Sequence, residues 1–174
     1  MLQKFQVIKQ AYNDFRISLL KKGKLPLRET AAGFWGTSIC DEIFKIFKRI
    51  NLQKFKNFLD VGSGDGRVVL IASLFTKATG IELDLQLYKK SLEIGNKLQL
   101  NAKFIHDDFF EHDFSNYDIL FCYPDKPLHH GLGHKLGEEL KGKLILYGHH
   151  LYPIPLHKKE EFRVNGTLIG IYTK

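Results

Sequence analysis

Three glycines at alternate positions follow a short apolar segment. They lie in the run Leu59-Asp60-Val61-Gly62-Ser63-Gly64-Asp65-Gly66. Because glycine adopts backbone conformations that side chains disfavour, such a turn lets the main chain approach a ligand closely. The free N–H groups of a helix that begins behind the turn can bind the same ligand. The spacing differs from the dinucleotide-binding fingerprint, whose third glycine would stand at position 67, the place of Arg67.

Glu82 ends the next predicted strand, 20 residues after Gly62. At that place a carboxylate can accept hydrogen bonds from both hydroxyl groups of a ribose. The glycine turn and Glu82 together therefore predict a binding site for a ligand that carries a ribose.

The segments that must position this site alternate between strand and helix patterns from residue 55 onward. Two further strands flank Asn165-Gly166, a strong hairpin signal. The alternation predicts an α/β fold, in which a mostly parallel sheet is covered on both faces and ends in an antiparallel hairpin. Ligands bind such sheets at the carboxyl ends of the strands. Strands are expected at 58–61, 78–82, 102–106, 117–122 and 143–147, and helices at 67–75, 85–98 and 134–140.

The first part of the chain follows a different pattern. Apolar residues recur every three or four positions over 2–20 and again over 39–50, which predicts two amphipathic helices, and 29–36 is expected to be a loop. Residues 1–56 hold 12 Lys and Arg against 4 Asp and Glu, whereas 57–174 hold 14 against 15, so the net charge of +7 originates in the first segment. This asymmetry indicates either an arm for an anionic partner or a lysine-rich solvated face.

Residues 55–174 resemble the class I, seven-strand, S-adenosylmethionine-dependent methyltransferases. The resemblance implies a Rossmann-like, doubly wound sheet, methyl transfer, and S-adenosyl-L-methionine as cofactor with S-adenosyl-L-homocysteine as product. It also implies two domains: a helical, basic extension or lid at 1–54 and a cofactor-binding methyltransferase domain at 55–174. The matching motifs are Asp60 to Gly66, Gly80-Ile81-Glu82-Leu83-Asp84, His106-Asp107-Asp108-Phe109 and Asp118-Ile119-Leu120-Phe121.

The first motif is expected to hold the methionine portion of the cofactor. By position, the turn that contains Gly62, Ser63, Gly64 and Gly66 lies under this portion, and Asp60 places its ammonium group. Asp65 is expected either to contact the ligand or to serve as a turn or helix-cap residue. Carboxylates at these positions complement the cationic ammonium and sulfonium groups.

The later motifs are expected to hold the nucleoside. The resemblance implies that Glu82 accepts hydrogen bonds from the ribose hydroxyls. It also implies that Asp108, in preference to Asp107, accepts one from the adenine amino group. Phe109 is expected to lie against the adenine ring or its loop.

Within the family, the chain is most similar to the archaeal protein-lysine methyltransferases, which implies a protein substrate. The similarity rests on 107–111, 118–123, 140–143, 148–149 and 166–172, while 33–38 would close over the cofactor. The sequence departs from that group at Cys122-Tyr123-Pro124-Asp125-Lys126-Pro127. Cys122 also stands where the Asn/Asp-Pro-Pro-aromatic motif of many nucleic-acid methylases has its amide or acid.

Three residues are candidates for catalysis. A lysine acceptor must lose its proton, and a dry aromatic channel favours this by destabilising the ammonium. Trp35 and Tyr123 are expected to line such a channel, and His149 is expected to accept a proton or to position the acceptor. Each can instead be an ordinary core or loop residue.

Other functions stay open on the sequence alone. The basic residues 1–56 would suit an RNA methyltransferase that tracks phosphates, and a non-catalytic module could keep the same cofactor pocket. A small-molecule acceptor is also open. No metal site is expected, because no cysteine or carboxylate completes the pair His130 and His134.

The composition indicates a cytoplasmic protein without a membrane partner. No apolar run approaches the roughly 20 residues that a membrane-spanning helix needs. The two cysteines, Cys40 and Cys122, are far apart in the sequence and point to a reducing compartment.

Overall fold

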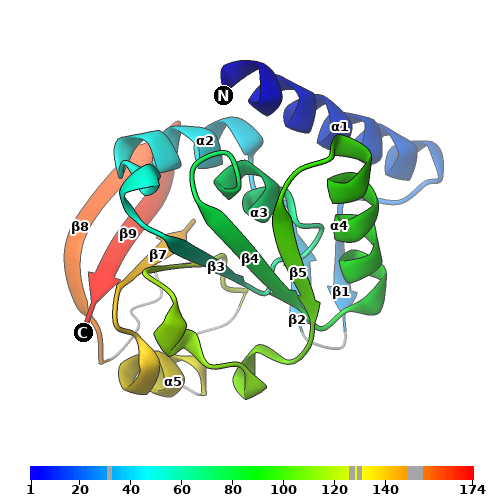
Figure 1. Cartoon of the computed structure of the whole chain (residues 1–174). Helices are drawn as coiled ribbons and strands as arrows, with labels where there is room; N and C mark the ends of the chain where they lie inside the picture. Colours follow the sequence, from blue (N-terminus) through cyan, green and yellow to red (C-terminus); the bar gives the residue numbers. More distant parts are fainter. Residues whose placement is uncertain (31–32, 126–127, 129–130, 149–154) are drawn as a thin grey trace.

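The structure, a computed structural model, describes residues 1–30, 33–125, 128, 131–148 and 155–174. Within these residues a seven-stranded sheet runs through the centre of the molecule in the order β5-β4-β3-β6-β7-β9-β8 (Figure 1). Neighbouring strands are parallel except that β9 runs antiparallel to β7 and β8. The strands are β3 (Asn57–Val61), β4 (Lys77–Glu82), β5 (Ala102–His106), β6 (Ile119–Cys122), β7 (Lys143–Tyr147), β8 (His157–Val164) and β9 (Thr167–Thr173).

The strand order reverses between β3 and β6. The chain proceeds from β3 to β4 and β5 on one side, and from β6 to β7 on the other. At the carboxyl end of this pair Val61 lies beside Cys122, and the apolar side chains of both strands are buried. A crevice forms at such a reversal because the connections leave in opposite directions, and ligands bind there.

Helices cover both faces of the sheet, as the sequence predicts. On one face the buried side chains of α1 (Leu2–Lys21), α2 (Cys40–Arg49), α3 (Arg67–Ala72) and α4 (Leu85–Leu98) join a single apolar cluster with the strands. The other face is covered by α5 (Leu132–Glu139) and by short 3₁₀ helices, Phe109–Glu111 and Phe114–Asn116. A further 3₁₀ helix, Leu52–Lys54, precedes β3.

The N-terminal helix is part of this packing. Phe5, Ile8 and Tyr12 of α1 are almost fully buried, and the Phe5 ring stacks on Phe44 of α2 with centroids 4.1 Å apart. The apolar spacing that predicts the helix therefore also predicts its buried face. The domain division at residue 54 stays a prediction.

The expected α/β class is confirmed, and the bounds 85–98, 102–106 and 143–147 are as predicted. The loop expected at 29–36 is wrong: β1 (Leu27–Thr30) and β2 (Gly33–Gly36) pair antiparallel, with Arg28 opposite Trp35. Each strand has only four residues, and contacts with distant segments hold them, so local periodicity gives no signal.

Crossing a lipid bilayer requires a helix that is both long and apolar. None of the described helices combines the two properties to the extent that a membrane span needs.

Candidate active site

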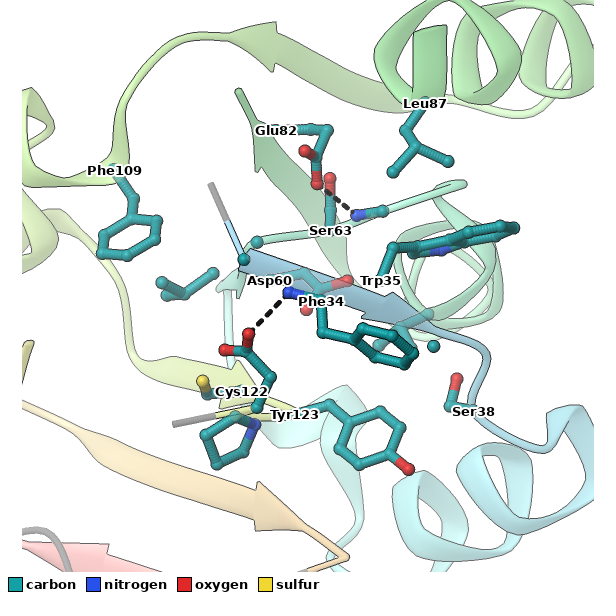
Figure 2. A pocket seen from close by; sticks show the side chains of 18 of the residues that line it. Phe34, Trp35, Ser38, Asp60, Ser63, Glu82, Leu87, Phe109, Cys122 and Tyr123 are labelled. Carbon is teal, nitrogen blue, oxygen red and sulfur yellow. Dashed lines mark hydrogen bonds between the residues drawn. The ribbon is translucent and has the colours of Figure 1, made fainter. Parts of the chain in front are cut away.

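A cavity of about 820 Å³ lies at the carboxyl ends of β3, β4 and β6. This size is typical of small-molecule sites. Its walls come from the β1–β2 hairpin, the glycine turn after β3, the end of β4, and the segments after β5 and β6. Figure 2 shows Glu82, Ser63 and Leu87 on one side of the cavity and Cys122 and Tyr123 on the opposite side.

The glycine turn takes the conformation that its sequence predicts. Gly62, Gly64 and Gly66 have φ values of 73°, 56° and 79°, in the left-handed region that other residues rarely adopt. At Gly62 a β-carbon would meet no atom within 4 Å, so the main chain is open to close approach there. Gly66 serves packing instead, since a β-carbon would lie 2.5 Å from Cβ of Ser91, and it does not line the cavity.

Glu82 joins the glycine turn to the start of α4. Its Oε2 accepts from the Gly64 N–H at 2.7 Å (Figure 2), and its Oε1 accepts from the Asp84 N–H at 2.8 Å. Burial raises the pKa of Glu82 above its usual value, and the two N–H donors oppose that rise. Each oxygen keeps a further acceptor position, which suits the pair of hydroxyls that the sequence predicts for it.

Asp60 is a buried carboxylate beside two other acidic side chains. Its side chain is 3% exposed, and burial first, then the charges of Glu82 and Asp65, raises its pKa well above the usual value. In the described part of the chain neither Asp60 nor Glu82 forms an ion pair. Burying a carboxylate this way is costly, so the site favours a ligand that brings positive charge.

Asp65 is neutralised by a residue of the protein. Its carboxylate accepts from Arg67 Nε at 3.0 Å and from Nη2 at 2.5 Å, and both side chains are almost fully buried. Burial lowers the pKa of the Arg67 guanidinium, but the charge and hydrogen bonds of Asp65 raise it by more. The net pKa of Arg67 therefore lies above its usual value. Arg67 also donates to the Ser38 carbonyl at 2.9 Å, and the Tyr12 hydroxyl donates to the Asp65 carbonyl at 2.9 Å.

Ser63 contributes a buried hydroxyl to the same wall. In the described residues its Oγ has no hydrogen-bond partner, and its N–H donates to the Ile81 carbonyl at 2.8 Å. Buried polar atoms are seldom left unsatisfied, and among the described residues this hydroxyl is such an exception.

The β1–β2 hairpin covers the cavity and is fixed at two sides. Arg28 Nη2 donates to Asp84 Oδ1 at 2.8 Å, and the Phe34 N–H donates to Asp125 Oδ2 at 2.6 Å (Figure 2). Trp35 lies 9% exposed against the glycine turn, where a β-carbon on Gly64 would come within 2.8 Å of its indole ring. The segment that the sequence expects to close over the cofactor therefore lies on this cavity.

Tyr123 stands at the cavity mouth with 47% of its side chain exposed. Its ring meets that of Tyr147 edge-on, with centroids 4.9 Å apart. The Tyr147 hydroxyl in turn donates to buried Glu42 at 2.6 Å. The third catalytic candidate, His149, lies outside the described residues.

The two residues expected at the adenine differ in placement. Phe109 lines the cavity, whereas Asp108 does not. The Oδ1 of Asp108 accepts from the Phe110 N–H at 2.9 Å. The geometry thus brings Phe109 together with Asp60, Glu82 and the glycine turn. The assignment of adenine to Asp108 stays a prediction.

Sequence reasoning missed three parts of the site: the Asp65–Arg67 pair, the anchor at Asp125 and the Glu42–Tyr147 bond. Arg67 is visible in the sequence only as the residue that breaks the dinucleotide fingerprint. Asp125 lies in the run where the sequence departs from its relatives, but its partner is 91 residues away. Glu42 lies within a predicted amphipathic helix, and that is its signal in the sequence. The structure shows that it is buried, and a glutamate is almost never buried unpaired.

The sequence matches the model of a known protein family. Residues 60–160 of the 174 match the model described as "ANTKMT methyltransferase domain". None of the curated proteins matches the sequence.

Several solved structures share the fold. An RNA methyltransferase from Salinibacter ruber, in complex with S-adenosyl-L-homocysteine, is 20% identical, with a TM-score of 0.66 over 79% of this chain and 92% of that one. A SAM-dependent methyltransferase from Aquifex aeolicus is 17% identical, with a TM-score of 0.60 over 76% and 88%. A hypothetical protein from Thermus thermophilus is 18% identical, with a TM-score of 0.64 over 85% and 92%.

Proposed function

The chain belongs to the ANTKMT methyltransferase domain family, and on that premise we propose that it transfers a methyl group from S-adenosylmethionine to a lysine side chain of a protein. The cofactor supplies an activated methyl group on a sulfonium. Asp60 carries the proposal, because a buried carboxylate that pairs with no cation among the described residues fits a ligand with an ammonium and a sulfonium.

The described residues provide a place for each part of this cofactor. Asp60 and the open turn at Gly62 receive the methionine portion, and Glu82 receives the ribose hydroxyls. Phe109 and Leu87, which line the cavity, offer apolar contact to the adenine. A cavity of about 820 Å³ is large enough for a ligand of this size.

The acceptor would approach beside Tyr123 and Trp35. An apolar, aromatic mouth destabilises the lysine ammonium, so the amine gives its proton to solvent before it reacts. S-adenosylmethionine would supply the methyl carbon to the neutral amine: as the nitrogen–carbon bond formed, the carbon–sulfur bond would break and sulfur would keep the electron pair. The protein contributes alignment and exclusion of water rather than a covalent step.

An RNA acceptor is the second candidate. It is favoured by the basic residues 1–56 and by the RNA methyltransferase among the proteins of similar fold. An incubation distinguishes the protein acceptor from the RNA acceptor. It contains the purified protein, a cell extract and S-adenosylmethionine labelled on its methyl group. Label removed by protease supports a protein acceptor, and label removed only by RNase would replace it with RNA.

We expect Tyr123→Ala to slow methyl transfer to protein about 10- to 100-fold, because the acceptor loses the ring that orients it. Cofactor affinity, measured by calorimetry, should stay within twofold. Tyr123→Phe, which keeps the ring, should retain most of the rate. Equal rates for wild type and Tyr123→Ala would contradict the placement of the acceptor at this ring.

Cofactor affinity is expected to rise as the pH rises through the elevated pKa of Asp60. Asp60 has a raised pKa in the free protein, so part of the population binds a proton there that a cationic ligand must displace. For the same reason the stability of the free protein falls as the pH rises through that pKa. Calorimetry in buffers of different ionisation enthalpy should show proton release on binding. Asp60→Asn should bind the cofactor more weakly and release fewer protons on binding. Unchanged proton release would contradict the role of Asp60.

A further inference from the structure

A second cavity, of about 340 Å³, adjoins the first at the carboxyl end of β7. Tyr123 and Thr37 line both cavities, so these two residues form a wall that the cavities share. The other walls of the second cavity are Ile39, Tyr147, Gly148, Arg163 and the hairpin turn and first residues of β9, Gly166 to Leu168.

The wall that the two cavities share is held firmly. The Tyr147 hydroxyl donates to Glu42 Oε2 at 2.6 Å and accepts from the Ile39 N–H at 3.3 Å. Glu42 is 2% exposed, so this hydrogen bond lies inside the protein. Because Tyr147 packs edge-on against Tyr123, the pair fixes the position of the Tyr123 ring from the side of the second cavity.

Arg163 is the charged side chain that lines this cavity in the described part of the chain. It is exposed and donates to the Gly166 carbonyl at 2.7 Å, while Lys45 donates to Asn165 Oδ1 at 3.1 Å in the same turn. Neither cation lies within 4.0 Å of a carboxylate in the described residues.

Four other charged side chains near this turn pair with one another. Arg49 pairs with Glu160 at 2.9 Å, and Lys158 pairs with Glu161 at 2.9 Å. Glu42 and Asp125 lie deeper, where each accepts from a neutral donor, the Tyr147 hydroxyl and the Phe34 N–H. Among the described residues that line the second cavity Arg163 carries the charge, and Lys45 contacts the same turn, so the charge at this entrance is positive.

We propose that the methyl acceptor enters through this second cavity, and that it is a lysine in an acidic peptide segment whose Asp or Glu residues pair with Arg163 and Lys45. The inference rests on the proposed function. A lysine stem passing between Thr37 and Tyr123 would bring its amine into the first cavity. Flanking carboxylates would meet two unpaired cations at the entrance, whereas flanking Arg or Lys would be repelled.

Two synthetic peptides test this route, each with one lysine, flanked by aspartates in one and by arginines in the other. We expect the wild-type protein to methylate the aspartate peptide with a kcat/KM at least about fivefold higher, the scale of an exposed ion pair. Arg163→Glu should lower kcat/KM for the aspartate peptide about five- to tenfold through KM, and should raise it for the arginine peptide. The difference should shrink as salt is raised from about 0.05 to about 0.5 M.

Lys103→Glu is the matched control, since Lys103 is exposed on β5, at the opposite edge of the sheet. It makes the same change in net charge and should leave the peptide preference as in wild type. S-adenosylmethionine affinity should stay within twofold for both variants. A lost preference in both variants would indicate a general charge effect and overturn the route.

The other outcomes separate this route from the proposed function. Equal transfer to both peptides, unchanged by Arg163→Glu, would overturn the route and leave lysine methylation intact. Cofactor binding without transfer to either peptide would overturn both. Transfer to an oligoribonucleotide, reduced by Arg163→Glu, would replace the acidic peptide with a phosphate backbone.

Discussion

Replacing Arg67 with methionine is expected to lower the free energy of unfolding by about 3–5 kcal/mol. The substitution keeps most of the side-chain length but removes the charge that neutralises Asp65, which is 2% exposed. The uncompensated buried carboxylate, rather than the lost ion pair itself, causes the large effect. Urea unfolding of the full-length protein without cofactor measures it.

Arg49→Met provides the control for this prediction. Arg49 also pairs with a carboxylate, Glu160, but about half of each side chain is exposed, so its loss should cost less than about 1 kcal/mol. The double variant Asp65→Leu/Arg67→Met should recover part of the stability, because it leaves no charge unpaired. Similar losses for Arg67→Met and Arg49→Met would show that burial of the pair contributes little.

Glu82→Ala is expected to weaken S-adenosylmethionine binding by about 1.5–3 kcal/mol, roughly 10- to 150-fold. The variant loses the oxygens that would accept from the ribose. It also frees the N–H groups of Gly64 and Asp84, so the glycine turn is less well fixed before the cofactor arrives. Calorimetric titration measures the affinity, and thermal unfolding without cofactor reports any loss of fold.

Glu111→Ala is the companion variant, since Glu111 is an exposed carboxylate close to the cavity that does not line it. It should change cofactor affinity less than twofold. Unchanged affinity in Glu82→Ala would show that Glu82 does not bind the cofactor. Equal weakening in both variants would show that Glu82 acts only through its negative charge.

The parts of the site that the sequence predicted are those set by local chemistry. Left-handed turns require glycine at positions 62, 64 and 66, and Glu82 ends a strand that the sequence predicts at 78–82. The contacts that close the site join Arg28 to Asp84 and Phe34 to Asp125 across 56 and 91 residues. No periodicity along the chain records such pairs, and for this reason the sequence alone predicts a loop where the hairpin lies.

The acceptor side is less predictable for a related reason. The Glu42–Tyr147 hydrogen bond joins residues 105 positions apart in the sequence. It fixes Tyr147, whose ring contacts that of Tyr123, and no sequence motif records this contact. Tyr123 could be proposed because it follows a buried strand, but the contact between Lys45 of α2 and Asn165 of the β8–β9 turn joins residues 120 positions apart, so no local pattern records it.

The anchoring of the β1–β2 hairpin also bears on how the protein is made. The hairpin leaves the ribosome before either residue that holds it, because Asp84 and Asp125 are synthesised 56 and 91 positions after their partners. Closing contacts of such long sequence separation costs chain entropy and slows folding. The cover of the cavity is therefore translated before its anchors, and a nascent chain that ends before β6 lacks Asp125 and has no complete binding site.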